Sequence, residues 1–432
     1  MRLEPPLLKD SWGPNLHGKE GEGGETMKYI ALPLMLMFSA IPLMSISSDR
    51  QNSIPPLERL RLSKSIKLSP QYPFDSEPGE VLHSFSADNR YIYFHGAYGE
   101  KPPKDREGGF AYMLDLKTLV TTKLDKIERF DCMRICPRSH WLATFKAEWQ
   151  DVKFSGSFWK MYNLPDCKLC LSGYVPELEI TAATFDQSGR FFALAVAEYS
   201  DFFSNKPIER GRLFLYRLSE DGSWKLVKDI NLPPGPKPIH FVEIIPALRW
   251  VVAAASDSQY HPFYIFDFDG ELVFAYQQLR RTYLEPPVGP RKLITDMASP
   301  PDQSRLVLSY QDGLLRVWKL TLPLEELNEN FLKVSKILHF PRAVYDDVFW
   351  GPNSRWLFVF GAEFIPPDQD ENLTIVLHVW DMKLLELHAR YKLPDVMLSR
   401  PIVSHDGKML AAVTREGDLQ LYELPQEYWV SK

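Results

Sequence analysis

The chain has 432 residues, of which 45% are hydrophobic and 13% aromatic, so it is long and apolar enough to bury a large core. Its 56 acidic and 50 basic residues give a formal net charge of −6, which argues against a surface that binds nucleic acid. Length alone favours two or three domains of ordinary size, although large all-β folds exceed that size as single domains.

The first 48 residues fall into two parts. Residues 1–26 are polar and rich in Gly and Pro, which indicates either a disordered segment or an over-long start, with Met27 as the true first residue. Residues 27–48 have a cationic start at Lys28, an uncharged apolar run from Tyr29 to Ile46, and small residues at the end. This layout is typical of a secretory signal peptide, so we expect an exported protein, periplasmic or secreted.

Two other interpretations of residues 27–48 stay open. A retained anchor would attach the protein to a membrane, but the run is at the short limit for spanning a bilayer, and Pro33 and Pro42 weaken a continuous helix. A buried core helix is the third interpretation, and the absence of a polar face argues against it. Residues 49–60 are predicted to be a linker, and the folded body is expected to span residues 61–432.

A short pattern recurs seven times in the rest of the chain: a turn, then a cation, then an apolar run. Successive copies lie 50 to 59 residues apart, which is the mark of a repeat architecture. The cationic positions are Arg90, His140, Arg190, Arg249, Arg305, Arg355 and Lys408.

Each copy carries a second landmark, a large apolar residue followed by a polar residue and another apolar one. The seven triplets are Leu114-Asp115-Leu116, Tyr162-Asn163-Leu164, Tyr216-Arg217-Leu218, Phe266-Asp267-Phe268, Trp318-Lys319-Leu320, Trp380-Asp381-Met382 and Tyr422-Glu423-Leu424. The segments between landmarks are rich in Val, Phe, Tyr, Trp and Leu and are bounded by turn residues, as strands are. Four short strands in each of seven copies predict an all-β fold, a seven-bladed β-propeller of four-stranded antiparallel blades.

Part of this pattern resembles the WD40 repeat family. The resemblance rests on Trp380-Asp381, on Val317-Trp318 and on the turn from Ser404 to Lys408, and it covers about residues 75–425. The Gly-His pair that opens many WD40 repeats is missing, and only one copy has Trp-Asp. The resemblance therefore implies the propeller fold, and the buried polar network of that family is not carried over.

The sequence also predicts how the ring closes. Too few residues follow Leu424 to complete a fourth strand, whereas residues 64–68, KSIKL, alternate in polarity and precede the first copy. We expect them to pair with the last blade, because closure removes exposed sheet edges. An open propeller with a frayed last blade is the alternative.

The longest connections are expected at one end of the ring. When the strands of a blade are called a to d from the channel outward, the b–c and d–a connections share one end, which we call the b–c end. The interval from the cation to the polar residue of the second landmark is 14 or 15 residues in copies five and seven, and 23 to 27 in copies one, two, three and six. Long loops on a rigid scaffold often carry recognition, which directs attention to this end.

An acid and an aromatic recur where these long connections begin, after an Ala in copies two, three and six. A rim of this kind can offer stacking surfaces and carboxylates to a peptide, glycan or cationic ligand, although each pair could equally brace its own blade. The rim candidates are Tyr98, Glu148, Trp149, Glu198, Tyr199, Glu363 and Phe364.

A mostly polar set stands near the predicted start of strand a. Asp131, His240, Asp296 and Asp346 could line the channel mouth and hold a cation or orient a substrate, or they could hydrogen-bond neighbouring backbone and join the blades.

All four cysteines, Cys132, Cys136, Cys167 and Cys170, fall in the second copy. Cys136 and Cys167 follow strands on the same end, so a disulfide between them is the favoured interpretation for an exported protein, ahead of free thiols and a zinc site.

No sequence motif of a catalytic module is present, and neither a cofactor nor a metal is expected. The favoured hypothesis is an exported, monomeric and non-catalytic platform that binds a protein or peptide through the b–c end. The alternative is a propeller hydrolase, lactonase-like or glycan-cleaving, that uses the channel-mouth residues or the rim glutamates as acids, bases or metal ligands.

Overall fold

The computed structural model contains two compact units, residues 1–49 and 50–432, and every residue described below belongs to the second. The described residues are 54–68, 82–96, 109–136, 139–150, 153–164, 166–198, 208–234, 238–255, 263–276, 294–320, 336–340, 343–364, 373–393, 401–414 and 417–430. Segments 1–26 and 27–48 lie outside these ranges. Within them, no helix is long and apolar enough to cross a membrane.

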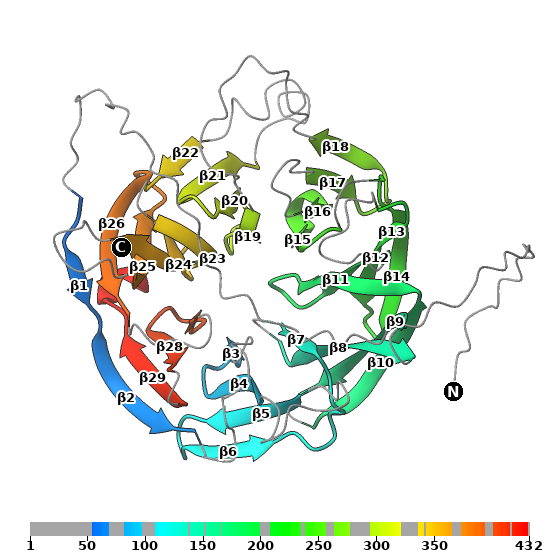
Figure 1. Ribbon diagram of the computed structural model, residues 1–432, viewed down its shortest axis with the longest axis horizontal. Helices are drawn as coiled ribbons and strands as arrows, with labels where there is room; N and C mark the ends of the chain where they lie inside the picture. The colour runs from blue at the N-terminus through cyan, green and yellow to red at the C-terminus, as the bar shows by residue number, and fades with distance from the viewer. Residues whose placement is uncertain are drawn as a thin grey trace, which may run out of the picture. The chain divides into compact units, whose positions relative to one another are not determined.

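The described strands form seven sheets that follow one another along the chain, and each is a blade whose four main strands are antiparallel (Figure 1). Blade one contains β3 (Leu82–Phe85), β4 (Tyr91–Gly96), β5 (Phe110–Asp115) and β6 (Val120–Lys123). Blade two contains β7 (Cys132–Ile135), β8 (Trp141–Gln150), β9 (Lys153–Asn163) and β10 (Lys168–Pro176). Blade three contains β11 (Leu178–Phe185), β12 (Phe191–Glu198), β13 (Gly211–Leu218) and β14 (Trp224–Asn231).

The later blades repeat this order. Blade four contains β15 (Phe241–Ile245), β16 (Trp250–Ala254), β17 (Phe263–Asp267) and β18 (Leu272–Tyr276). Blade five contains β19 (Ile294–Ala298), β20 (Arg305–Tyr310), β21 (Leu314–Lys319) and β22 (Lys336–His339). Blade six contains β23 (Ala343–Trp350), β24 (Trp356–Phe364), β25 (Leu373–Asp381) and β26 (Glu386–Lys392), and blade seven begins with β27 (Ile402–Val403), β28 (Met409–Val413) and β29 (Asp418–Glu423).

An N-terminal strand completes the last blade. Strand β2 (Arg61–Lys67) pairs antiparallel with β29, so that Ile66 lies opposite Leu419. The predicted closure by residues 64–68 is therefore confirmed, with pairing that starts at Arg61. Just upstream, β1 (Leu57–Arg59) adds in parallel to β26 as a fifth strand of blade six, so three residues of the segment predicted as linker form a strand.

The two landmarks of the repeat recur together because they are joined in space. The last apolar residue of each triplet donates its backbone N–H to a carbonyl in the turn before strand b, as Leu424 does to Lys408 at 2.8 Å and Met382 to Arg355 at 2.8 Å. Blade five uses Ser304 in place of Arg305. Arg355 also pairs with the nearly buried Asp381, with Nη2 and Oδ2 2.5 Å apart. Each turn thus fixes where strand c ends.

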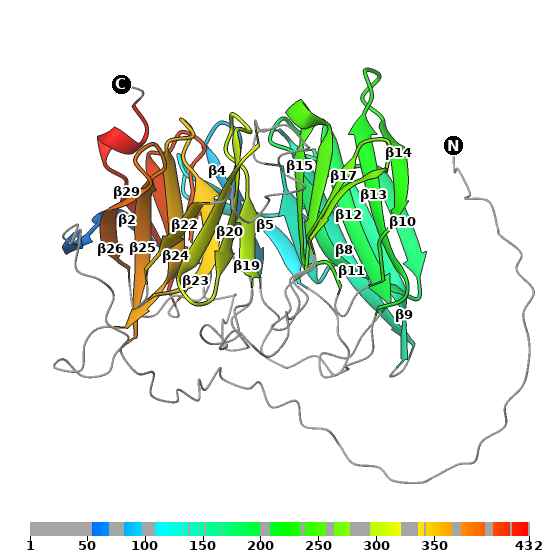
Figure 2. The same ribbon diagram turned by 90° about the horizontal axis from the view of Figure 1, so that it is seen from above.

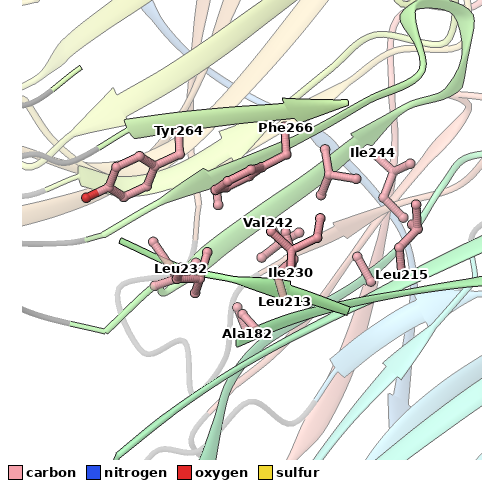
Figure 3. Packing of buried hydrophobic residues seen from close by; sticks show 14 of the residues in the cluster. Ala182, Leu213, Leu215, Ile230, Leu232, Val242, Ile244, Tyr264 and Phe266 are labelled. Atoms are coloured by element: carbon pink, nitrogen blue, oxygen red, sulfur yellow. The ribbon is translucent and has the colours of Figure 1, made fainter. Parts of the chain in front are cut away.

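Apolar residues fill the space between neighbouring blades. Seven clusters of buried residues exist in the described part of the chain, and each lies between two consecutive blades, including blades seven and one. Figure 3 shows the cluster between blades three and four, where Leu213 and Leu215 of β13 face Val242 of β15 and Phe266 of β17. Since burying one such side chain contributes about 1.5–3 kcal/mol, these interfaces supply the main stabilisation of the ring.

Replacing Ile66 by Asp should test the closing strand. Ile66 is 9% exposed and packs in the cluster between blades seven and one, whereas Leu62 on the same strand is 48% exposed. We expect Ile66→Asp to lower the free energy of unfolding by about 2–5 kcal/mol and Leu62→Asp to change it by less than about 1 kcal/mol, as measured by urea denaturation. Equal effects of the two changes would contradict closure through β2.

Candidate functional site

The shared strand order places equivalent connections of all blades at the same end of the ring. In each blade strand a is innermost, and inner strands of consecutive blades contact one another around the centre, as β11 and β15 do. Figure 2 shows the ring from the side, with the β9 end of the blade-two hairpin at its lower edge. The candidate rim residues Glu148, Glu198 and Glu363 all lie at or near the b–c ends of their b strands.

Blade two uses its extra residues for longer strands. Glu148 and Trp149 belong to β8, and the pairing of β8 with β9 continues to Gln150 opposite Lys153, which leaves a connection of only residues 151–152. The side chain of Trp149 is half-buried and meets Phe154 edge to face, with ring centroids 5.4 Å apart. The expected long loop of copy two is thus a projecting hairpin that carries an aromatic pair.

The rim glutamates each bond within their own blade. Glu148 Oε2 accepts a hydrogen bond of 3.1 Å from Ser155 Oγ across the β8–β9 hairpin. Glu198, the last residue of β12, forms an ion pair with Arg210 of the facing segment. These contacts are compatible with the bracing alternative, and the rim role of both carboxylates stays a prediction. Tyr98 and Tyr199 lie outside the described residues, and the backbone of Phe364 pairs with Leu373 at the end of β24.

Glu363 belongs to a buried polar chain in blade six. Tyr345 Oη lies 3.0 Å from His378 Nδ1, His378 Nε2 lies 3.3 Å from Glu363 Oε2, and Arg390 Nε donates to the same oxygen at 3.1 Å. Burial opposes ionisation of Glu363, but the hydrogen bonds from His378 and Arg390 outweigh it and lower the pKa of Glu363. Burial lowers the pKa of His378. These hydrogen bonds connect all four main strands of blade six, from strand a to strand d.

The predicted channel-mouth residues are distributed over four blades. Asp131 is exposed just before β7, and its Oδ2 accepts a hydrogen bond of 2.7 Å from the Ala147 backbone. His240 is exposed just before β15, and Asp346 is exposed on β23. No group of three or more His, Cys, Asp or Glu side chains among the described residues is arranged to hold a metal ion.

Two carboxylates meet between blades five and six. Asp296 Oδ2 of β19 accepts the Val348 N–H of β23 at 2.9 Å, and Asp347 Oδ1 accepts the same N–H at 3.2 Å. Burial, together with the neighbouring Asp347 carboxylate, raises the pKa of Asp296 well above its usual range. The repeat spacing predicted Asp296 and Asp346 for the channel mouth. Asp347 takes the place beside Asp296 because a bulge between Tyr345 and Asp347 shifts the register of β23 by one residue.

A second carboxylate, also missed from the sequence, joins blades four and five. Glu243 of β15 accepts hydrogen bonds from the backbone N–H and the Oγ of Ser299, and burial raises the pKa of Glu243 to about 7. The Ser299 carbonyl accepts the Gln187 side-chain amide of blade three at 3.0 Å. In the sequence, the only sign of this contact is one acidic residue, Glu243, within the otherwise apolar strand FVEII. Glu243 and Asp296 therefore both connect a blade to the next one.

All four cysteines lie within the described ranges, and none of them forms a disulfide. Cys136 packs in the cluster between blades two and three, where its Sγ lies 3.7 Å from the Asp186 carbonyl, and Cys167 packs in the cluster between blades one and two. The expected Cys136–Cys167 disulfide is therefore not formed, because the two thiols lie on opposite faces of the blade-two sheet. Cys132 is half-buried and Cys170 is exposed.

Comparison with known proteins supports the fold and does not assign the chain to a family. No family model and no curated protein matches the sequence. A chain from the crystal structure of the mitotic checkpoint complex matches with a TM-score of 0.55 and 9% identity, over 89% of this chain and 100% of that one. The β-propeller domain of Cps50 (Swd1) from Myceliophteria thermophila matches with a TM-score of 0.55 and 12% identity, over 85% and 100%. The protein thus has the seven-bladed, WD40-like propeller fold expected from its repeats.

Replacing Asp296 by Asn should test the carboxylate pair between blades five and six. A carboxyl group whose pKa is raised on folding contributes stability while it is protonated, and this contribution is lost as pH rises through the folded pKa. Asn at position 296 keeps an acceptor for the Val348 N–H and removes the charge. We therefore expect the melting temperature of Asp296→Asn, relative to wild type, to increase from pH 4 to pH 8.

Asp346→Asn serves as the control, because Asp346 is the exposed neighbour on β23. We expect its melting temperature relative to wild type to vary little over the same pH range. A flat profile for Asp296→Asn, or the same profile for both variants, would show that the Asp296 carboxylate does not oppose stability at neutral pH.

Proposed function

We propose that this protein is a non-catalytic platform that binds a protein or peptide through the b–c end of its propeller. One observation carries the proposal: the β8–β9 hairpin extends the sheet of blade two and holds the half-buried Trp149 against Phe154 near its tip. A hairpin paired to its last residues presents this aromatic in a fixed position. A pre-positioned side chain loses little conformational freedom when a partner binds.

The chemistry of the hairpin suits a polypeptide partner. Trp is among the residues that contribute most to protein interfaces, because its large ring buries apolar area and its N–H can donate a hydrogen bond. The exposed Lys153 directly precedes Phe154 on β9, and Lys146 lies further along β8, opposite Phe158. A partner segment with an apolar side chain and a neighbouring acid would complement this surface.

The structural comparisons support the proposal by analogy. One of the similar chains comes from the crystal structure of the mitotic checkpoint complex. The shared feature is the propeller scaffold, and a fold alone does not determine a partner. The analogy supports binding of a protein as the class of function. The β8–β9 hairpin of this chain supports blade two as the binding site.

The Asp296–Asp347 pair favours a second candidate function, a propeller hydrolase. Two carboxylates on facing inner strands could divide acid and base roles between them. Their shared hydrogen bond to the Val348 N–H accounts for the pair as a joint between blades, so the platform is the stronger proposal.

We further propose that residues 27–48 direct export and that the partner is met outside the cytoplasm, in the periplasm or in the extracellular space. The sequence layout of these residues supports this proposal. The mass of the mature chain tests it: cleavage near Ser48 is expected after a signal peptide, and a chain that retains residues 27–48 in a membrane fraction would contradict secretion and favour an anchor.

Replacing Trp149 by Ala should weaken partner binding. We expect at least a tenfold loss of affinity for the partner, because truncating a central Trp of an interface costs about 2 kcal/mol or more. The free energy of unfolding should fall by no more than about 1.5 kcal/mol, which is the contribution of one aromatic pair. The partner is first captured with a photo-crosslinking residue at the exposed position 153, which keeps Trp149 in place, and the affinities are then measured by calorimetry.

Leu226→Ala is the matched control, because Leu226 is 51% exposed on β14, the outer strand of blade three. It should leave the affinity unchanged. Unchanged binding by Trp149→Ala would contradict the proposed site, and unfolding of Trp149→Ala would make Trp149 a structural residue.

A further inference from the structure

A turn arginine and a strand-c aspartate form an ion pair in blades one and six, at the positions of the two repeat landmarks. In blade one, Arg90 donates from Nε and Nη2 to Asp115 Oδ2 at 3.3 and 2.8 Å. Blade six repeats this contact between Arg355 and Asp381. These two positions therefore bring a guanidinium and a carboxylate within hydrogen-bonding distance of each other.

Blade three has arginine at both of these positions, and we call Arg190 and Arg217 the arginine pair. Arg190 stands in the turn before β12, and Arg217 stands on β13 where blades one and six have aspartate. The backbone contact is retained, because the Leu218 N–H donates to the Arg190 carbonyl at 2.8 Å. Both arginines are exposed, and among the described residues no acidic side chain forms an ion pair with either guanidinium.

Blade five shows how two cations at these positions can be satisfied within the chain. Arg305 and Lys319 occupy them, and Arg305 Nη1 donates to the Met382 carbonyl of blade six at 2.8 Å. In the part of the chain that the structure describes, neither guanidinium of the arginine pair donates a hydrogen bond. Like charges on neighbouring strands are destabilising. An anion from outside the chain would relieve this repulsion.

An aromatic surface lies beside the arginine pair. The Arg217 guanidinium lies 5.9 Å from the centre of the Phe191 ring, and the centroids of Phe191 and Phe268 are 4.8 Å apart. Phe191 is half-buried against the cluster between blades three and four. The next cation, Arg249, lies over Phe268 and pairs with Asp269 at 3.4 Å, so its charge already has a partner. The uncompensated positive charge is therefore confined to blade three.

We propose that the arginine pair binds an Asp or Glu side chain from an acidic peptide segment of a partner protein. The partner's carboxylate takes the place that Asp115 has in blade one and Asp381 has in blade six. Guanidinium groups suit this role, because their planar N–H groups can donate two parallel hydrogen bonds to one carboxylate. The half-buried Phe191 ring offers an apolar surface to the methylene groups of the same side chain.

This contact is separate from the partner site proposed on the blade-two hairpin. Arg190 lies in the turn between strands a and b, which stands at the opposite end of the ring from the b–c connections. The arginine pair therefore gives the protein a second interaction surface, and its test does not depend on the outcome at Trp149.

Titration of the full chain with acetylated tetraglutamate tests the proposal, with NMR detection of the arginine Nε–Hε signals. The signals of Arg190 and Arg217, assigned from the Arg190→Gln and Arg217→Gln spectra, should shift and saturate. Each substitution should weaken binding by about fivefold or more, the effect of one exposed ion pair. No saturable shift of the two signals, or an equal shift with acetylated tetraglutamine, would overturn the proposal.

Arg217→Asp and Lys319→Asp are the matched variants, because they make the same change of charge at equivalent positions of blades three and five. Arg217→Asp should pair with Arg190 as Asp115 pairs with Arg90, and binding of tetraglutamate should be lost. Lys319→Asp should keep its affinity within about twofold, because a distant exposed charge is largely screened. Retained binding in Arg217→Asp, or equal losses in the two variants, would overturn the assignment to the arginine pair.

The melting temperature of Arg217→Asp gives a readout that needs no ligand. Replacing a repulsive pair by an attractive one should keep the melting temperature at or above that of wild type in low salt. The difference should shrink in about 0.5 M sodium chloride, which screens exposed charges. A lower melting temperature that does not depend on salt would show that Arg217 is already satisfied in the free protein, and would overturn the proposal.

Discussion

The structure depends on one constraint: every blade is apolar on both faces, so a blade is stable only between two others. In blade three, Leu213 and Leu215 face blade four, whereas Phe192 and Phe214 face blade two. Sheets that must be covered twice can either stack without end or close in a circle. The cluster that joins blades seven and one, and the strand β2 that completes blade seven, show that this chain closes.

The buried polar side chains of the ring mainly form hydrogen bonds between or within blades. Glu243 and Asp296 are carboxylates on inner strands, and each accepts a hydrogen bond from the following blade. Glu363 connects strands b, c and d of blade six through His378 and Arg390. A channel whose acids already serve as joints between blades is consistent with a scaffold. The partner site proposed above lies on the blade-two hairpin, which contains none of these three carboxylates.

The repeat predicted the fold because its two landmarks are a single physical unit. The turn before strand b and the triplet that ends strand c are hydrogen-bonded to each other, so they are retained together even where the residues differ. Closure by residues 64–68 was predictable because apolar Ile66 and Leu68 alternate with polar residues there, and both are buried: Ile66 is the one buried residue of β2, and Leu68 directly follows the strand. Strand β1 was not predictable, because a three-residue strand with two exposed charged residues has no hydrophobic pattern.

The candidate site was less predictable, because it depends on details that repeat spacing does not contain. A one-residue bulge places Asp347, and not Asp346, beside Asp296. Interval lengths identified the elongated connection of blade two but could not distinguish a loop from two longer strands. The cysteine pairing failed for a similar reason: Cys136 and Cys167 share one end of the ring but pack on opposite faces of the sheet.

Closure of the ring can be tested directly with a pair of introduced cysteines, Ser65→Cys and Gln420→Cys. Residues 65 and 420 are partners in the β2–β29 pairing, at a separation suited to a disulfide. After mild oxidation, peptide mapping should find these two positions linked within one chain in most molecules. If both thiols stay free, or if each links to another chain, then β2 does not close the propeller and the account of a sealed ring is wrong.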